Sequence, residues 1–307
     1  MKKPRALKPG DAITIIAPAS PVQKELFLAG VHELESMGFR ALYTEEIFHS
    51  FRYLSGTDEQ RALALNRAFA DPDSKAIFCA RGGYGTIRLL PFLEPSEIRK
   101  TPKLFLGSSD ATALLIFLTE KCRMPVLHGP MPATEIRQGE SKYDRARFLQ
   151  LLTSAAAPAE ITVPGASCLR EGKAHGVLTG GCLSVLASLM GTPYEPNTQG
   201  KILFLEDQNM KPYQIDRILT QFKLAGKFDG VQGVIFGEMP GCIQNKDQGY
   251  SLPEVLLELL APYPFPILYA FPSGHTDGKH IPLPFGLHVT MNSEKRSLKI
   301  EEPLVKP

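Results

Sequence analysis

Leu104-Phe105-Leu106-Gly107-Ser108-Ser109-Asp110-Ala111 places two hydroxyl side chains between an apolar run and a helix-like segment. The apolar run is typical of a buried strand that leads directly into the turn. A serine on such a turn exposes its hydroxyl beside a helix N-terminus, which stabilises negative charge. The turn is close to the G-x-S-x-G nucleophile elbow, although Ala111 stands at the second glycine position. Hydroxyl residues before helices are more often plain N-caps, so this segment alone leaves catalysis open.

The same order of strand, loop and helix recurs upstream of this turn. Apolar runs at residues 12–17, 41–44 and 76–80 predict buried strands. Apolar residues at helical spacing over 26–37, and the capping-box pattern Thr57-Asp58-Glu59-Gln60, predict helices between them. A βαβ series of this kind predicts a mostly parallel sheet covered on both faces. Function is then expected at the carboxyl ends of its strands.

Two domains are expected, because 307 residues exceed the length over which a single core usually grows. Between residues 138 and 172 the pattern weakens into charged and Ala/Pro-rich sequence, which indicates an interdomain connection. We therefore predict an N-terminal α/β domain over 1–160 and a C-terminal domain over 161–307 with a larger share of strand. The expected strands of the second half are 201–205, 234–236, 267–270, 287–291 and 298–300, and its expected helices are 213–224 and 252–260.

Composition argues against several classes of partner. The 34 basic and 32 acidic residues are interspersed, so no field suited to nucleic acid or an anionic membrane is expected. No apolar run approaches the roughly 20 residues of a membrane span. The basic start at residues 1–5 is not followed by an apolar signal core. We expect a cytoplasmic protein that acts on a small molecule.

The cysteines do not indicate a disulfide framework or a metal site. Cys79, Cys122, Cys168, Cys182 and Cys242 are odd in number and lack any C-x-x-C pair. Free cysteines of this kind are typically small buried hydrophobic residues. No metal ligand is therefore predicted.

A glycine-rich loop, Arg81-Gly82-Gly83-Tyr84-Gly85, follows the predicted strand 76–80. It should lie beside the serine turn, because the carboxyl ends of parallel strands share one edge of the sheet. Its glycines allow backbone N–H groups to approach a ligand oxygen, although a tight βα turn is an equally good interpretation. The spacing matches neither G-x-G-x-x-G nor the P-loop, so a nucleotide phosphate is poorly supported. Arg81 could bind a substrate carboxylate or form a structural ion pair.

Two acids and a histidine in the second half complete a possible catalytic set. Glu206 and Asp207 end an apolar run, where a carboxylate can fix the tautomer of a histidine ring. Sequence alone does not separate these two acids from each other or from ordinary surface acids. His275 lies in a loop after the predicted strand 267–270. Loop histidines that a strand positions are more often functional than histidines in the core. The other histidines, each expected to be structural, are His32, His49, His128, His175, His280 and His288.

Over most of its length the chain resembles the LD-carboxypeptidases of the S66 serine peptidase family, which also includes the microcin C self-immunity proteins. The matching segments, in the family's order, are residues 81–85, 107–110, 205–207 with 212–217, and 274–275 with 281–286. The resemblance implies that Ser109 is the nucleophile, His275 the base and Glu206 the residue that orients the base. Family members often carry an aromatic residue where this chain has Ser108.

The resemblance also implies a fold and a reaction. The N-terminal domain would be flavodoxin-like, the C-terminal domain β/β/α, and the active site would lie between them. Ser109 would attack the L,D-amide bond of a murein tetrapeptide and release the terminal D-alanine during cytoplasmic recycling of the cell wall. Backbone N–H groups of Asp110 and of Gly82 or Gly83 would bind the oxyanion. The implied chemistry needs no metal and no organic cofactor, and the implied assembly is a homodimer.

Two other functions remain open from the sequence. The first is hydrolysis of aminoacyl-nucleotide analogues, as in the microcin immunity branch, which would stack an aromatic side chain on the base. The chain has no Trp but contains nine Tyr and 17 Phe. The second is a non-catalytic sugar- or peptide-binding protein on the same two-domain plan. A complete serine, acid and histidine set argues against the second, because a binding protein has no need of a base.

Overall fold

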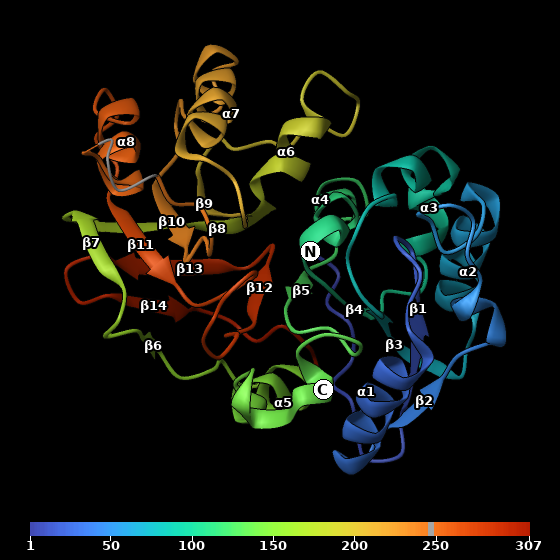
Figure 1. Cartoon of the computed structure of the whole chain (residues 1–307). Helices are drawn as coiled ribbons and strands as arrows, with labels where there is room; N and C mark the ends of the chain where they lie inside the picture. Colours follow the sequence, from blue (N-terminus) through green and yellow to red (C-terminus); the bar gives the residue numbers. More distant parts are fainter. Residues whose placement is uncertain (245–248) are drawn as a thin grey trace.

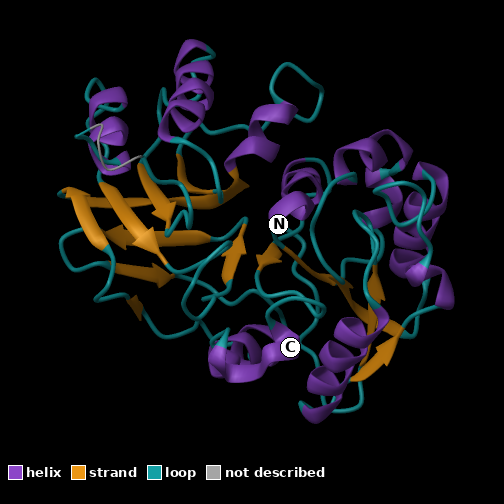
Figure 2. Cartoon of the chain, in the orientation of Figure 1, coloured by secondary structure: helices purple, strands orange, loops and turns teal. Residues whose placement is uncertain are grey.

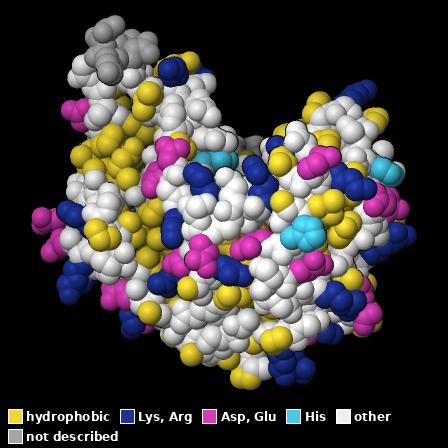
Figure 3. Space-filling model, turned by 60° about the horizontal axis from the view of Figure 1, so that its bottom comes forward, with side chains coloured by type: hydrophobic (Ala, Val, Ile, Leu, Met, Phe, Trp, Pro, Cys, Tyr) yellow, Lys and Arg dark blue, Asp and Glu magenta, His cyan; other side chains and the backbone are white. Residues whose placement is uncertain are grey.

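Two β-sheets, one centred in each half of the chain, form two lobes that helices cover (Figures 1 and 2). The fold is described from a computed structural model, in which residues 1–244 and 249–307 are placed. The expected α/β class, with a parallel sheet followed by a second sheet, is confirmed. None of the helices within these residues is long and apolar enough to cross a membrane. Basic and acidic side chains are interspersed on the face shown in Figure 3.

The first sheet has the strand order β12-β5-β4-β3-β1-β2, and all neighbours are parallel except β12 and β5. Its strands are β1 (Ala12–Ile16), β2 (Arg40–Leu42), β3 (Ser74–Cys79), β4 (Leu104–Gly107), β5 (Val126–His128) and β12 (Leu283–Phe285). The helices of this half are α1 (Lys24–Ser36), α2 (Asp58–Ala70), α3 (Pro95–Ile98), α4 (Thr112–Glu120) and α5 (Arg145–Thr153), with short helices η1 (Glu45–Phe48), η2 (Thr86–Phe92), η3 (Ser109–Ala111) and η4 (Ile136–Ser141). The predicted capping box of α2 is present: the Thr57 side chain accepts from the Gln60 amide, and Gln60 accepts from the Thr57 amide.

The second sheet has the order β6-β14-β13-β8-β9-β10-β11-β7, with β8 to β11 parallel and the outer strands antiparallel. Its strands are β6 (Ile161–Thr162), β7 (Ser167–Arg170), β8 (Lys173–Cys182), β9 (Lys201–Glu206), β10 (Gly233–Gly237), β11 (Ile267–Phe271), β13 (His288–Asn292) and β14 (Ser297–Ile300). Its helices, α6 (Leu183–Leu189), α7 (Pro212–Leu224) and α8 (Leu252–Leu259), line up along the top of this lobe in Figure 1.

The segment expected to be an interdomain connection is more ordered than predicted. It contains helix α5, whose Phe148, Leu151 and Leu152 are buried, and the strands β6 and β7. The apolar face of α5 was not recognised in the sequence, because charged residues stand between its apolar residues at helical spacing. The domain division at residue 160 stays a prediction.

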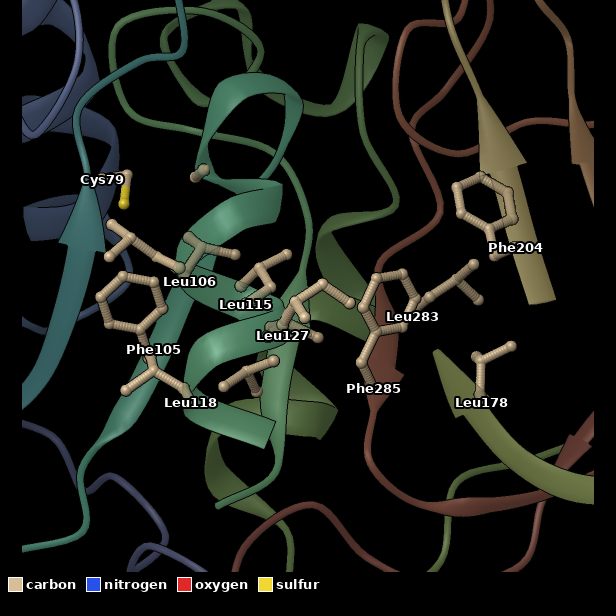
Figure 4. Close-up of a cluster of buried hydrophobic side chains, with 14 of the residues drawn as sticks. Cys79, Phe105, Leu106, Leu115, Leu118, Leu127, Leu178, Phe204, Leu283 and Phe285 are labelled. Carbon is tan, nitrogen blue, oxygen red and sulfur yellow. The ribbon is translucent and has the colours of Figure 1, made fainter. Parts of the chain in front are cut away.

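The core continues from one sheet into the other. Figure 4 shows Leu127 of β5, Leu283 and Phe285 of β12, and Phe204 of β9 following one another across the two lobes. Strand β12 makes this possible, because it belongs to the second half of the chain yet pairs with β5 of the first sheet. Helix α4 lies in this region and is buried on all sides, which explains its uninterrupted apolar sequence.

Candidate active site

Ser109 occupies a strained turn between β4 and α4. Its backbone φ is +56°, in the left-handed region that residues with a Cβ seldom adopt. A side chain at Gly107 could not fit the turn, since its Cβ would lie 2.6 Å from the Ala111 Cβ. Ser108 is buried, whereas Ser109 is partly exposed. The turn therefore presents Ser109, and not Ser108, to the surface.

The glycine-rich loop after β3 packs directly against Ser109. A Cβ added to Gly82 would lie 2.9 Å from the Ser109 Oγ and 3.5 Å from the Asp110 amide nitrogen, so only glycine fits there. The buried Asp110 side chain fixes the loop by accepting a hydrogen bond of 2.8 Å from the Thr86 amide. Burial raises the pKa of Asp110, although the N–H groups of Gly85 and Thr86 stabilise its charged form. Sequence reasoning assigned a role only to the Asp110 backbone.

Glu206 and His275 form a close pair in the second lobe. Glu206 ends β9 and is fully buried, and its Oε2 lies 2.7 Å from the His275 Nδ1 and accepts from the His275 amide at 2.9 Å. Gly274 makes room for the carboxylate, since a Cβ there would lie 2.5 Å from the Glu206 Cδ. Burial lowers the pKa of His275, but the hydrogen bond and charge of Glu206, together with the charges of Asp207 and Glu135, outweigh the effect of burial. The pKa of His275 is therefore raised above its ordinary value.

Asp207, the other acid that the sequence left open, points elsewhere. Its carboxylate accepts hydrogen bonds from the amides of Ser184 at 2.9 Å and Gln208 at 2.8 Å. These contacts tie the end of β9 to the first turn of α6. Of the two acids, only Glu206 contacts His275 in the described part of the chain.

A contact between the lobes brings the serine turn next to the strand that carries the acid. The Thr112 Oγ1, on the first residue of α4, accepts a hydrogen bond of 3.0 Å from the Cys182 amide at the end of β8. Cys182 is paired with Glu206 in the β8–β9 ladder. A Cβ at Gly181 would lie 2.5 Å from the Thr112 Oγ1, so the approach requires glycine. Sequence reasoning missed this contact, because neither segment carries a recognisable motif.

Two further histidines hold the loop that carries His275. The buried His280 accepts a hydrogen bond of 3.1 Å at Nε2 from the Gly274 amide. The buried His128 on β5 lies with its Nδ1 3.4 Å from the Oγ of Ser273. Because an imidazole nitrogen can accept only when it carries no proton, His280 must be neutral and protonated at Nδ1. Both residues are buried and contact the two residues that precede the candidate base.

These two histidines are expected to make the protein less stable in mildly acidic solution. Burial is the largest effect on both rings and lowers the pKa of each below the ordinary value of 6.5, although the charges of Glu135 and Glu206 partly oppose it at His280. The unfolded chain therefore binds more protons than the folded chain below about pH 6.5. The free energy of unfolding should be at its full value above that pH and decrease as the pH falls.

The variant His128→Phe tests this expectation, because the His128 ring already stacks on Phe285 with centroids 5.1 Å apart. Urea unfolding between about pH 7 and pH 5 gives the free energy of unfolding at each pH. Its slope against pH should be shallower in the variant than in the wild type by up to about 1.4 kcal/mol per pH unit, the effect of one proton. The exposed His32 on α1 provides the control variant His32→Gln, whose slope should match the wild type. An unchanged slope in His128→Phe would contradict the prediction.

The described residues offer no evident metal site. In the two ranges that the structure covers, no group of three or more His, Cys, Asp and Glu side chains is placed to hold a metal ion. All five cysteines are free, and only Cys168 is not fully buried. Burial raises the pKa of the Cys122 thiol to about 12.

Comparisons with known proteins agree over both halves of the chain. The profile of the LD-carboxypeptidase N-terminal domain matches residues 13–129, and that of the LD-carboxypeptidase C-terminal domain matches residues 175–291. The chain is 35% identical over 301 residues to the probable murein peptide carboxypeptidase of Bacillus subtilis, covering 97% of this chain and 94% of that protein.

Two other relatives represent the two activities considered for the chain. The microcin C7 self-immunity protein MccF of Escherichia coli is 28% identical, covering 95% of this chain and 94% of MccF. The crystal structure of muramoyltetrapeptide carboxypeptidase from Oxalobacter formigenes is 28% identical, with a TM-score of 0.83 over 94% of this chain and 97% of that one.

Proposed function

Because the chain belongs to the S66 LD-carboxypeptidase family, we propose that it is a serine-type carboxypeptidase that releases the terminal D-alanine from murein tetrapeptides. Relatives named as murein peptide carboxypeptidases support a hydrolase that acts on murein peptides. The observation that carries the finer proposal is the 2.7 Å contact between Glu206 and His275, on a lobe joined to the strained Ser109 turn.

In the proposed mechanism, Ser109 attacks the scissile carbonyl while His275 takes its proton. Since the Nδ1 of His275 faces Glu206, the Nε2 is the nitrogen left to receive that proton. The Glu206 carboxylate holds the ring in this tautomer and stabilises the imidazolium that forms. The imidazolium then gives its proton to the amine of the departing D-alanine. Water, activated by the same histidine, hydrolyses the acyl-enzyme and restores Ser109.

Backbone N–H groups beside Ser109 would stabilise the oxyanion of the tetrahedral intermediate. The Asp110 amide and one from Gly82 or Gly83 are the candidates, because Gly82 packs against both Ser109 and the Asp110 nitrogen. Each such donor typically stabilises the transition state by about 3 kcal/mol. The fixed backbone of the loop, held by Asp110, keeps these donors in place before the substrate binds.

A carboxypeptidase must recognise the free carboxylate of the residue that it releases. Arg81, on the loop beside Ser109, is the first candidate for this contact. Amidating the terminal D-alanine is expected to lower kcat/KM by about 10²-fold, the equivalent of roughly 1.5 to 3 kcal/mol for a charge-assisted hydrogen bond. Replacing D-alanine with L-alanine should also impair cleavage, since the inverted methyl group would meet the wall that positions the scissile bond. Mass spectrometry of the released residue measures both effects.

Equal turnover of the D-alanine, L-alanine and amidated peptides would reject this specificity. The similarity to MccF keeps hydrolysis of aminoacyl-nucleotide analogues as a second candidate. Rapid cleavage of an aminoacyl sulfamoyl adenylate without cleavage of the tetrapeptide would favour it. Binding of either compound without turnover would favour a non-catalytic protein. The homodimer and the cytoplasmic location stay predictions.

A further inference from the structure

A cavity of about 340 Å³ lies at the carboxyl ends of β1, β3 and β5, the edge of the first sheet that also carries Ser109. Its polar lining includes Gln23 before α1, Arg81 after β3, and Thr134 and Arg137 after β5. Strand β4, which leads to Ser109, lies between β3 and β5. The cavity is therefore formed by loops on both sides of the serine turn.

Two arginines in this cavity have no acidic partner. Within the described residues, neither Arg81 nor Arg137 forms an ion pair, although four other arginines do. An Arg81 Nη donates to the Pro21 carbonyl at 3.2 Å, while its buried Nε has no hydrogen-bond partner. The Arg137 Nε donates to the Ala133 carbonyl at 3.1 Å, within its own turn.

The nearby acid does not neutralise these cations. Glu135 uses its Oε2 to accept from the Met131 amide at 3.0 Å and from the Thr134 hydroxyl. Two half-buried guanidinium groups that line one cavity and lack a carboxylate partner indicate an anionic ligand. Guanidinium groups bind carboxylates well, because their paired N–H donors match the two oxygens.

We propose that this cavity binds the terminal carboxylate of the substrate, with Arg137 as a specificity-determining residue alongside Arg81. The proposal rests on the proposed function, and it adds a residue that sequence reasoning did not find. The carboxylate of the departing residue is separated from the scissile nitrogen by a single carbon, so its site must adjoin the nucleophile. Arg81 meets this requirement, since the next residue, Gly82, packs against Ser109.

The loop after β5 is held close to the same place. The Ala133 amide donates to the Ala80 carbonyl at 2.9 Å, which joins this loop to the residue before Arg81. Arg137 follows on η4, and η4 packs against α1. A carboxylate in the cavity would thus meet one guanidinium from each side.

The cavity also separates the two candidate activities. A murein tetrapeptide loses a residue that carries a free carboxylate. An aminoacyl sulfamoyl adenylate loses a sulfamoyl nucleoside, which has none. Replacing Arg137 should therefore slow cleavage of the murein tetrapeptide and leave cleavage of the aminoacyl sulfamoyl adenylate nearly unchanged.

The test compares Arg137→Gln and Arg81→Gln with the wild type, using murein tetrapeptide and its terminal amide. Each variant should lower kcat/KM for the tetrapeptide by about 10- to 100-fold, as expected for loss of a charge-assisted hydrogen bond, and leave the amide almost unchanged. The matched control is Arg40→Gln, an exposed arginine on the edge strand β2, which should behave as the wild type. Equal loss on both substrates, or no loss on either, would overturn the proposal.

A binding experiment keeps this proposal separate from the proposed function. Calorimetry with the Ser109→Ala protein measures affinity for the tetrapeptide and its amide without turnover, before and after adding Arg137→Gln. A preference for the free carboxylate that Arg137→Gln abolishes supports the cavity even if the wild type proves inert. A wild type that cleaves the tetrapeptide, with affinity that does not depend on Arg137, supports the function and rejects the cavity.

Discussion

Ser109→Ala is expected to lower turnover of murein tetrapeptide by about 10⁴-fold or more, because it removes the proposed nucleophile. The fold should be unaffected. Alanine keeps the Cβ that serine already places at the left-handed φ of +56°, so the substitution adds no backbone strain. Release of D-alanine, followed by mass spectrometry, and the far-UV circular dichroism spectrum measure the two expectations.

Ser108→Ala is the matched control, since it removes the neighbouring hydroxyl from the same turn. Ser108 is buried and should not reach a substrate, so most of the activity should remain. Wild-type turnover by Ser109→Ala would reject Ser109 as the nucleophile. Covalent labelling of Ser108 by an active-site serine reagent would identify Ser108 as the nucleophile instead.

His275→Ala should be as damaging as Ser109→Ala, because the serine hydroxyl is a weak nucleophile without a base. Combining the two substitutions should cost little more than either one, since members of one catalytic unit are not additive. Single-turnover rates of the two single variants and the double variant provide the measurement. A double variant whose loss equals the product of the two single losses would show that the residues act independently.

Glu206→Gln should lower activity less than His275→Ala and should also change its pH dependence. The base acts in its neutral form, and the pKa of His275 in the wild type is raised above 6.5. The ascending limb of the kcat/KM profile against pH should therefore lie above pH 6.5. Removing the charge of Glu206 lowers that pKa and moves the limb to lower pH. Asp207→Asn is the control and should move the limb less, because the charge of Asp207 raises the pKa of His275 less than Glu206 does. A severe effect of Asp207→Asn with a mild effect of Glu206→Gln would identify Asp207 as the acid.

The sequence predicted those parts of the site that lie at the ends of regular strands. Ser109 and the loop at Gly82 follow apolar runs that the βαβ pattern places side by side, and the structure brings them into contact. The choice between Glu206 and Asp207 needed coordinates, because β9 ends at Glu206 and adjacent residues of an extended chain point to opposite faces. Only the fold shows which face the loop at His275 approaches.

Other features could not be predicted, because they depend on contacts between distant segments. Strand β8 lacks an apolar run, since it contains glycines where other chain segments approach closely. The hydrogen bond between the Gly274 amide and His280 joins residues that are close in sequence. Its role in holding the loop of the candidate base can be seen only when the structure places His275 beside Glu206. Arg137 belongs to no recognisable sequence motif. Only the structure shows that it has no acidic partner among the described residues, which is the observation that suggests anion binding.

The late arrival of β12 has a consequence for synthesis on the ribosome. Residues 126–128 are made early, yet the strand that covers their outer edge comes from residues 283–285. Until then the nascent chain carries an apolar strand with unpaired backbone groups, which is a template for pairing with other chains. Completion of the first sheet must wait until residues 283–285 have emerged. The candidate base His275 and the strand that protects this edge therefore emerge close together during synthesis.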